Sequence, residues 1–245
     1  MALDYNSPNP LYGKSLRPNE PRAKTAVILI YCVLGIQVIS IFAAVSQHFL
    51  LQKIAVGDYT EASVYLNDLF ISILNYIYVA VMICSAVTFI MWFRRAYFNL
   101  HTKVRVLAYS EGWASGAWFV PILNLVRPFQ IMKELYDETA LVLRRNDIVR
   151  GNIPTAPLGA WWGMWLGSNI ITNIGVRIIK QGYSIDTIIL GNGIEIFGSI
   201  LHCVAAVLVI QVIRNYAKAE PLLLRVSTEE EIQQAALQPA EEKAG

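Results

Sequence analysis

The sequence predicts an all-α integral membrane protein with four transmembrane helices in two hairpins. Between the hairpins we expect a central re-entrant or interfacial segment followed by an amphipathic helix. The 245 residues are 55% hydrophobic and only 16% charged, whereas soluble domains carry about 25% charged residues. Several apolar runs are longer than the roughly 18 residues that mark a helix able to cross a bilayer. The bilayer is therefore the expected solvent of this chain.

Long apolar runs define the four expected spans, at about residues 25–51, 69–93, 158–179 and 188–213. The first run is too long for the apolar core of a signal peptide and lacks a convincing small-residue cleavage site, so we interpret it as an uncleaved span. A single transmembrane domain is expected over residues 24–216. The polar segments 1–23 and 217–245 are expected to be tails, and the first of them is expected to be flexible.

The central element covers residues 112–145 and follows a basic connector expected at 94–111. Its first part, residues 113–126, would extend roughly 21 Å as a helix, which is less than the roughly 30 Å hydrocarbon core. Pro121 interrupts this part, which favours a dip into the membrane or a position at its surface over a crossing. From Arg127 onward apolar residues recur with a period near 3.6, which predicts an amphipathic helix.

The distribution of Lys and Arg predicts the topology. If both termini are cytoplasmic and the central element does not cross, only Lys53, Arg177 and Lys180 lie on the opposite side. A crossing by the central element would divide the large basic cluster between the two sides. The positive-inside rule therefore favours four spans with cytoplasmic termini, and five or six crossings remain the alternative.

The sequence around the central element resembles a known family. Residues 92–100 read WFRRAYFNL, residues 112–121 read GWASGAWFVP, and an NL pair, an RP pair and an ExL string follow. The motif residues are Trp113, Trp118, Pro121, Asn124, Arg127, Pro128, Gln130 and Glu134. Over roughly residues 70–215 this order is similar to the bacterial membrane family catalogued as domain of unknown function 4328, although Tyr136 stands where Trp is usual. The resemblance implies a bacterial multi-span protein, which we place in the inner membrane, without an assigned activity or catalytic residues.

No sequence motif for catalysis, cofactor binding or metal binding is found. Glycine-rich phosphate loops, nucleophile elbows and zinc-binding helices are all missing from the sequence. The three histidines lie in different segments without ligand spacing. The three cysteines fall inside apolar runs, where they are expected to be unpaired. We therefore expect no catalytic, cofactor or metal site, and no nucleic-acid partner.

Glu195 is the strongest single candidate for a functional residue. A carboxylate inside an apolar run costs free energy unless it faces a partner or water. Folding the last two spans about the turn near Tyr183 places Glu195 level with residue 171. The candidate polar residues around it are Asn169, Asn173, Arg177 and His202. A structural role, in which Glu195 ties two helices together, is favoured. A path for protons or cations is the alternative.

Gly159, Gly163 and Gly167 recur every four residues and share one helix face. Small residues on one face let another helix approach closely. Packing within the monomer is the first expectation for this face, and self-association is the second.

A group of arginines is expected at the cytoplasmic surface, formed by Arg94, Arg95, Arg127, Arg144 and Arg145. Basic residues near a membrane anchor its topology and are attracted to anionic lipids. Topological anchoring is favoured, and a pocket for an anionic ligand or lipid head group under the WFVPILNLVRP turn is the alternative.

These features favour a non-enzymatic scaffold or accessory subunit that works through protein partners, lipids or a second copy of the chain. A small transporter or channel component that uses Glu195 and the central element is the second hypothesis. An intramembrane enzyme comes third, because no acid/base pair or activated nucleophile is visible.

Overall fold

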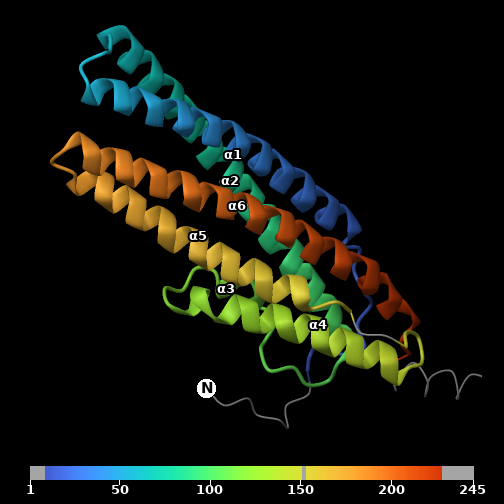
Figure 1. The fold of residues 1–245 in the computed structure, drawn as a ribbon. Helices are drawn as coiled ribbons and strands as arrows, with labels where there is room; N and C mark the ends of the chain where they lie inside the picture. The colour runs from blue at the N-terminus through green and yellow to red at the C-terminus, as the bar shows by residue number, and fades with distance from the viewer. Residues whose placement is uncertain (1–8, 151–152, 228–245) are drawn as a thin grey trace, which may run out of the picture. The chain divides into compact units, whose positions relative to one another are not determined.

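The computed structural model describes residues 9–150 and 153–227, and these residues contain only helices, turns and loops (Figure 1). The α-helices are α1 (Glu20–Ala55), α2 (Glu61–Lys103), α3 (Trp113–Gly116), α4 (Arg127–Arg145), α5 (Ala156–Gln181) and α6 (Ile185–Ala219). Two 3-10 turns, η1 (Leu123–Leu125) and η2 (Glu220–Arg225), complete the described elements. The all-α prediction is confirmed.

Among the described residues, α1, α2 and α6 are the helices long and apolar enough to cross a membrane. The third expected span, residues 158–179, does form a helix, α5, but it is not one of these three. Asn169 and Asn173 interrupt its apolar sequence, and Arg177 follows them. Length and composition therefore show three candidate spans rather than the four that we expected.

The chain divides into two compact units. We call residues 25–88 and 156–212 the hairpin unit, because it holds the α1–α2 hairpin and the α5–α6 hairpin (Figure 1). We call the remaining described residues, 9–24, 89–150, 153–155 and 213–227, the motif unit. The motif unit contains α3, α4, η1 and η2, together with the ends of α2 and α6.

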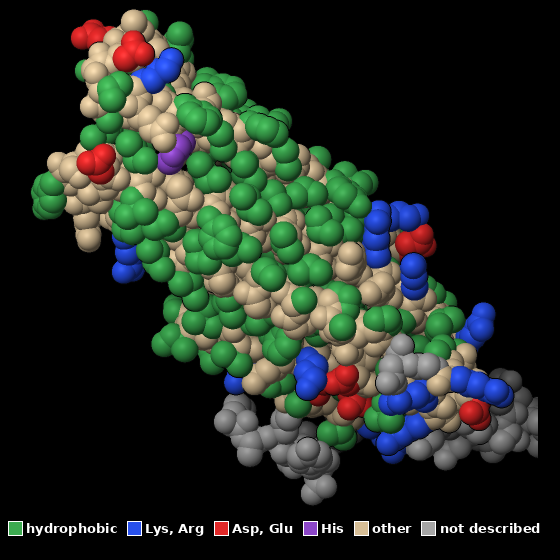
Figure 2. Space-filling view, in the orientation of Figure 1, with side chains coloured by type: hydrophobic (Ala, Val, Ile, Leu, Met, Phe, Trp, Pro, Cys, Tyr) green, Lys and Arg blue, Asp and Glu red, His purple; other side chains and the backbone are tan. Residues whose placement is uncertain are grey.

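The outer surface of the hairpin unit is apolar. Green apolar side chains predominate on its visible face (Figure 2). Large side chains such as Phe42, Tyr76 and Ile170 are 71%, 78% and 61% exposed. Contiguous exposed apolar surface of this kind marks contact with a membrane or a partner. The helices of this unit therefore have the surface expected of membrane spans.

Three glycines bring α5 and α6 into backbone contact. A Cβ atom added at Gly175 would lie 2.9 Å from the carbonyl oxygen of Gly191 and 3.0 Å from the backbone nitrogen of Glu195. A Cβ atom at Gly198 would lie 3.1 Å from the backbone nitrogen of Thr172. Residues without a side chain are needed wherever two helix backbones approach this closely.

The glycine face predicted from the sequence does not make this contact. A Cβ atom at Gly159, Gly163 or Gly167 would meet nothing within 4 Å. These glycines therefore make no close helix contact within the hairpin unit, and the packing expected of their face stays a prediction. The four-residue spacing places the glycines on one face of α5, but the close backbone approach to α6 is found at Thr172 and Gly175, further along the helix.

Helix α2 is longer than its apolar run. It continues through Lys103, so residues 94–103, expected in a connector, are helical. The reason is that Tyr97 and Leu100, beyond the basic pair Arg94–Arg95, are fully buried in the motif unit. The end of an apolar run marks where contact with lipid is expected to end, and burial against protein can extend the helix beyond it.

The described part of the N-terminal segment is held in place, in contrast to the flexible tail that we expected. The Nδ2 group of Asn9 donates to the carbonyl oxygens of His101 at 2.9 Å and Val104 at 3.0 Å. The backbone nitrogen of Arg17 donates to Oδ1 of Asn99 at 3.0 Å. Residues 1–8 of the expected tail, and residues 228–245 of the expected C-terminal tail, lie outside the described residues.

Candidate functional site

The hairpin unit contains a cavity of about 380 Å³ lined by α1, α2, α5 and α6. Polar side chains from all four helices reach it, although the outer surface of the same helices is apolar. Pockets of 300–1,000 Å³ with a few placed polar groups are typical sites for small molecules. This cavity is the candidate functional site.

Helical periodicity explains why polar residues gather there. On α6, Glu195, Ser199 and His202 are separated by four and then three residues, so they share one face. On α1, Gln37 and Ser40 are separated by three residues and also line the cavity. Two apolar helices thus carry narrow polar stripes that border one space.

Glu195 is the single charged side chain among the described residues that line the cavity. None of the described residues donates a hydrogen bond to its carboxylate. The Nδ2 group of Asn169, which lines the cavity, donates instead to the carbonyl oxygen of Trp165 at 2.6 Å. The tie between α5 and α6 that we expected at Glu195 is therefore not made by Asn169.

Two other residues expected near Glu195 do not line the cavity. Asn173 is exposed and donates to the carbonyl oxygen of Asn169 at 2.8 Å. Arg177 is also exposed. His202 does line the cavity, so the structure brings three of the predicted residues together: Asn169, Glu195 and His202.

The polar stripe of α6 is anchored on each side of Glu195. Asn192 is only 2% exposed. Its Oδ1 atom lies 3.1 Å from Nδ1 of His48, and its Nδ2 group donates a hydrogen bond to Oε1 of Gln47 at 3.3 Å. On the other side, Nδ1 of His202 lies 3.2 Å from the hydroxyl of Ser168. Because that hydroxyl donates to the carbonyl oxygen of Trp165 at 2.9 Å, Nδ1 of His202 is assigned as the donor.

The motif residues do not line the cavity. Several of them form contacts within the motif unit instead. Glu134 accepts hydrogen bonds from the hydroxyl of Tyr97 and from the backbone nitrogen of Ala108. Burial raises the pKa of Glu134 above its ordinary value, and these two hydrogen bonds oppose the shift. Gln130 accepts a hydrogen bond from the hydroxyl of Tyr109 at 2.9 Å. Two polar motif residues therefore join α4 to the segment after α2.

Arg127 lies against aromatic rings. Its guanidinium carbon is 4.5 Å from the ring centroid of Trp113 and 5.5 Å from that of Tyr109. Contacts of a cation with aromatic faces are worth about 0.5–1 kcal/mol at exposed sites and more when they are desolvated. The next residue, Pro128, is buried at the first turn of α4, where a missing N–H group has no cost.

The loop between α3 and α4 exposes apolar side chains. Phe119 is 75% exposed and Ile122 is 79% exposed. Ile122 has a φ of 67°, which a β-branched residue rarely adopts. Trp118, Pro121 and Asn124 lie in this loop, and the ring of Trp118 packs on Phe89 of α2 with centroids 5.6 Å apart.

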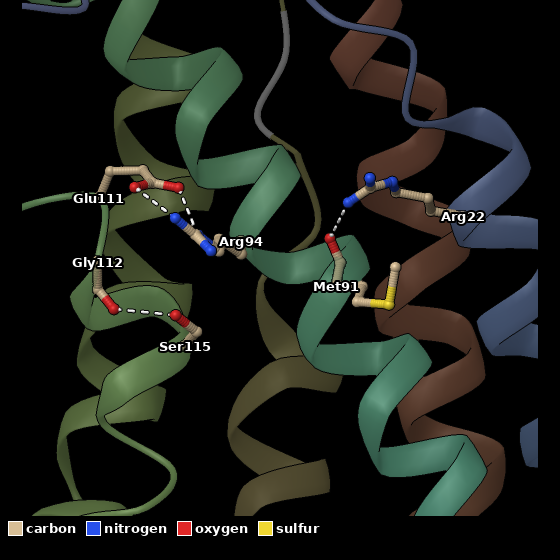
Figure 3. Close-up of polar contacts among 6 residues, drawn as sticks. All are labelled: Arg22, Met91, Arg94, Glu111, Gly112 and Ser115. Atoms are coloured by element: carbon tan, nitrogen blue, oxygen red, sulfur yellow. Dashed lines mark hydrogen bonds and ion pairs between the residues drawn. The ribbon is translucent and has the colours of Figure 1, made fainter.

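Several arginines form local contacts (Figure 3). The Nε group of Arg94 lies 2.7 Å from Glu111, and Arg22 donates to the carbonyl oxygen of Met91 at 3.0 Å. Partial burial, reinforced by Arg22 and Arg17, lowers the pKa of Arg95. The remaining two arginines of the predicted group, Arg144 and Arg145, are exposed in the last turn of α4.

A buried polar network in the motif unit had not been predicted. Glu220, 7% exposed, accepts from Nδ2 of Asn99 at 2.7 Å and from Nδ2 of Asn19 at 3.0 Å. Burial raises the pKa of Glu220, while these amides and the charge of Arg95 oppose the shift. No sequence signal joins residues 19, 99 and 220, because only the tertiary fold brings them together.

Comparison with known proteins gives one match. The model of a family described as a domain of unknown function (DUF4328) matches residues 57–218. No curated protein and no solved structure matches the chain significantly. The matched region includes α2 to α6 and therefore most of both units.

Proposed function

The chain belongs to the family described as a domain of unknown function (DUF4328), and from this premise we propose that it is a small membrane transporter or channel component. The cavity at Glu195 carries the proposal. A carboxylate inside an apolar helix is a default functional site, and here the partly buried Glu195 faces a space of about 380 Å³. The sequence alone favoured a scaffold, because it did not reveal this space.

The proposal includes α5 as a fourth span, with both termini in the cytoplasm of a bacterial cell. Asn169 and Thr172 of α5 line the cavity, so these polar residues need not face lipid. Trp165, which is partly exposed near the start of α5, suits a membrane interface. A less apolar helix can cross a bilayer when its polar residues border a protein cavity.

The loop between α3 and α4 is proposed to enter the cytoplasmic leaflet without crossing. Trp118 packs on Phe89, which belongs to the apolar part of α2, and the exposed side chains of Phe119 and Ile122 are apolar. Arg144 and Arg145 are proposed to contact anionic lipid head groups, whose attraction is worth about 1 kcal/mol per basic residue.

The experiment is a flux measurement in liposomes loaded with a pH-sensitive dye. We expect the wild-type protein to conduct protons, or protons coupled to a cation, when a gradient is imposed. Glu195→Gln should abolish this flux and leave the protein folded, because an amide keeps the shape of the carboxylate and cannot titrate. Glu61→Gln, at an exposed carboxylate in the first turn of α2, is the matched control and should leave the flux unchanged.

Equal flux through the wild type and Glu195→Gln would refute the role of Glu195. A complete lack of flux from well-folded wild-type protein, with protons and with K⁺, would refute the transport proposal.

A scaffold or accessory subunit is the second candidate, and the glycine face of α5 favours it. The open space at Gly159, Gly163 and Gly167 leaves this face available to a helix of a partner or a second copy. Gly163→Leu would then disrupt the assembly without unfolding the monomer. Light scattering or native mass spectrometry on the protein in lipid nanodiscs measures the assembly directly.

A further inference from the structure

We propose that the cavity binds a small organic monocation through a primary ammonium group placed at Glu195. This inference rests on the proposed function and names the class of its ligand. Three properties of the cavity carry it: its charge, its unpaired hydrogen-bond acceptors and its size.

The charge of the cavity favours a single positive charge on the ligand. Glu195 is a carboxylate, and no Lys or Arg is among the described residues that line the cavity. A carboxylate that is partly withdrawn from water is stabilised by an opposite charge close to it. Since the lining supplies none, a cationic ligand would provide the missing partner, and an anion would be repelled.

The acceptors of the cavity match an ammonium group. The donor group of Asn169 is used by the carbonyl oxygen of Trp165, so its side-chain carbonyl remains as an acceptor. The hydroxyl oxygen of Thr172 is buried against Gly198 of α6, so it is closed to a ligand in the cavity. An ammonium group has three donors and no acceptor. The carboxylate of Glu195 on α6 and the side-chain carbonyl of Asn169 on α5 could therefore engage it together.

The size and wall of the cavity favour an organic ligand over a bare metal ion. A volume of about 380 Å³ far exceeds the roughly 30 Å³ of one water molecule. The wall on α2 includes Ile71, Leu74, Met82 and the ring of Tyr78. Apolar and aromatic groups contact a carbon skeleton well, and an aromatic face also attracts a cation.

The experiment uses the full-length protein in lipid nanodiscs and four probes. Three share a four-carbon skeleton and a hydroxyl end: 4-aminobutan-1-ol, 1,4-butanediol and 4-hydroxybutyrate. The fourth is K⁺. Titration calorimetry and the melting temperature report binding. We expect the amine alone to bind saturably and to raise the melting temperature. Glu195→Gln should weaken its binding at least tenfold, while Glu61→Gln should leave it unchanged.

A second variant keeps the test decisive if Glu195→Gln fails to fold. Asn169→Leu retains the carboxylate and removes one acceptor, so it should weaken binding of the amine several-fold. Equal binding of the diol or the hydroxybutyrate would overturn the cationic ligand. Equal stabilisation by K⁺ at the same concentration would overturn the organic ligand.

The two proposals can fail separately. Amine binding that depends on Glu195, without any flux in liposomes, would retain the ligand class and remove transport. Flux that depends on Glu195, without amine binding, would retain transport and overturn the ligand class.

Discussion

Replacement of Gly175 by alanine tests the contact between α5 and α6. The added Cβ atom would lie 2.9 Å and 3.0 Å from backbone atoms of α6, which cannot move away as the end of a flexible side chain can. The two helices would have to separate locally. Overpacking of a well-packed site costs about 1–3 kcal/mol, whereas glycine to alanine inside a helix gains about 1 kcal/mol.

Gly163→Ala is the matched control on the same helix, because its Cβ atom would meet nothing within 4 Å. We expect this variant to be stabilised by about 0.5–1 kcal/mol through helix propensity alone. Gly175→Ala should be destabilised by up to about 2 kcal/mol after the same gain is subtracted. The two variants should therefore differ by about 1–3 kcal/mol in the free energy of unfolding.

The assay is reversible unfolding in mixed micelles, titrated with a denaturing detergent and followed by circular dichroism. Equal stability of the two variants would refute the glycine contact at Gly175. Destabilisation by Gly163→Ala in a preparation shown to be monomeric would mean that the face of Gly159, Gly163 and Gly167 packs within the chain after all.

Three further outcomes are expected. Burial lowers the pKa of His101 to about 4, so between pH 6.5 and 4 the unfolded chain binds a proton that the folded chain does not. As the pH is lowered through this window, the free energy of unfolding should decrease by about 3 kcal/mol in total. In His101→Gln the decrease should be smaller. Asn99→Ala should cost about 1–3 kcal/mol in denaturant unfolding, because it leaves buried Glu220 with one donor fewer, and an unchanged midpoint would contradict the network. Single cysteines at Lys103 and Arg150, in a background without native cysteines, should both resist a membrane-impermeant thiol reagent in spheroplasts; labelling of only one would mean that the central element crosses.

The helices could be predicted from the sequence because apolar runs and helical periods report directly on the solvent that a helix faces. The amphipathic helix beginning at Arg127 is confirmed for the same reason, with Met132, Leu135 and Tyr136 on its buried face. The ends of the helices were less predictable. Helix α2 continues to Lys103 because it is buried against protein there, and an apolar run cannot distinguish lipid from protein.

The candidate site was predicted only in part. Glu195 stood out because its charge conflicts with its apolar surroundings. Gln37 and Tyr78 did not stand out, because uncharged polar residues are common in spans and only the tertiary fold shows that they line the same cavity. The glycine face makes no close contact within the hairpin unit, since spacing defines a face of one helix but not the helix that meets it.

Polar residues spaced at a helical period inside an apolar run are the sequence signal for such a cavity. Gln37 and Ser40 on α1, and Glu195, Ser199 and His202 on α6, have this spacing. Each stripe is too narrow to change the mean hydropathy of its helix much. The stripes indicate a cavity only when the tertiary structure shows that both border the same space.

The most direct test of this account is cysteine accessibility along the two polar stripes, in membranes and without the native cysteines. Cysteines at Ser40 and Ser199, which line the cavity, are compared with cysteines at their neighbours Ile39 and Ile200, which are 50% and 46% exposed on the apolar surface. A small, positively charged thiol reagent should react with the first pair and not with the second, because only the cavity admits water and cations. Equal protection of all four positions would mean that the cavity is closed and dry in the membrane, and would contradict its role as a binding site.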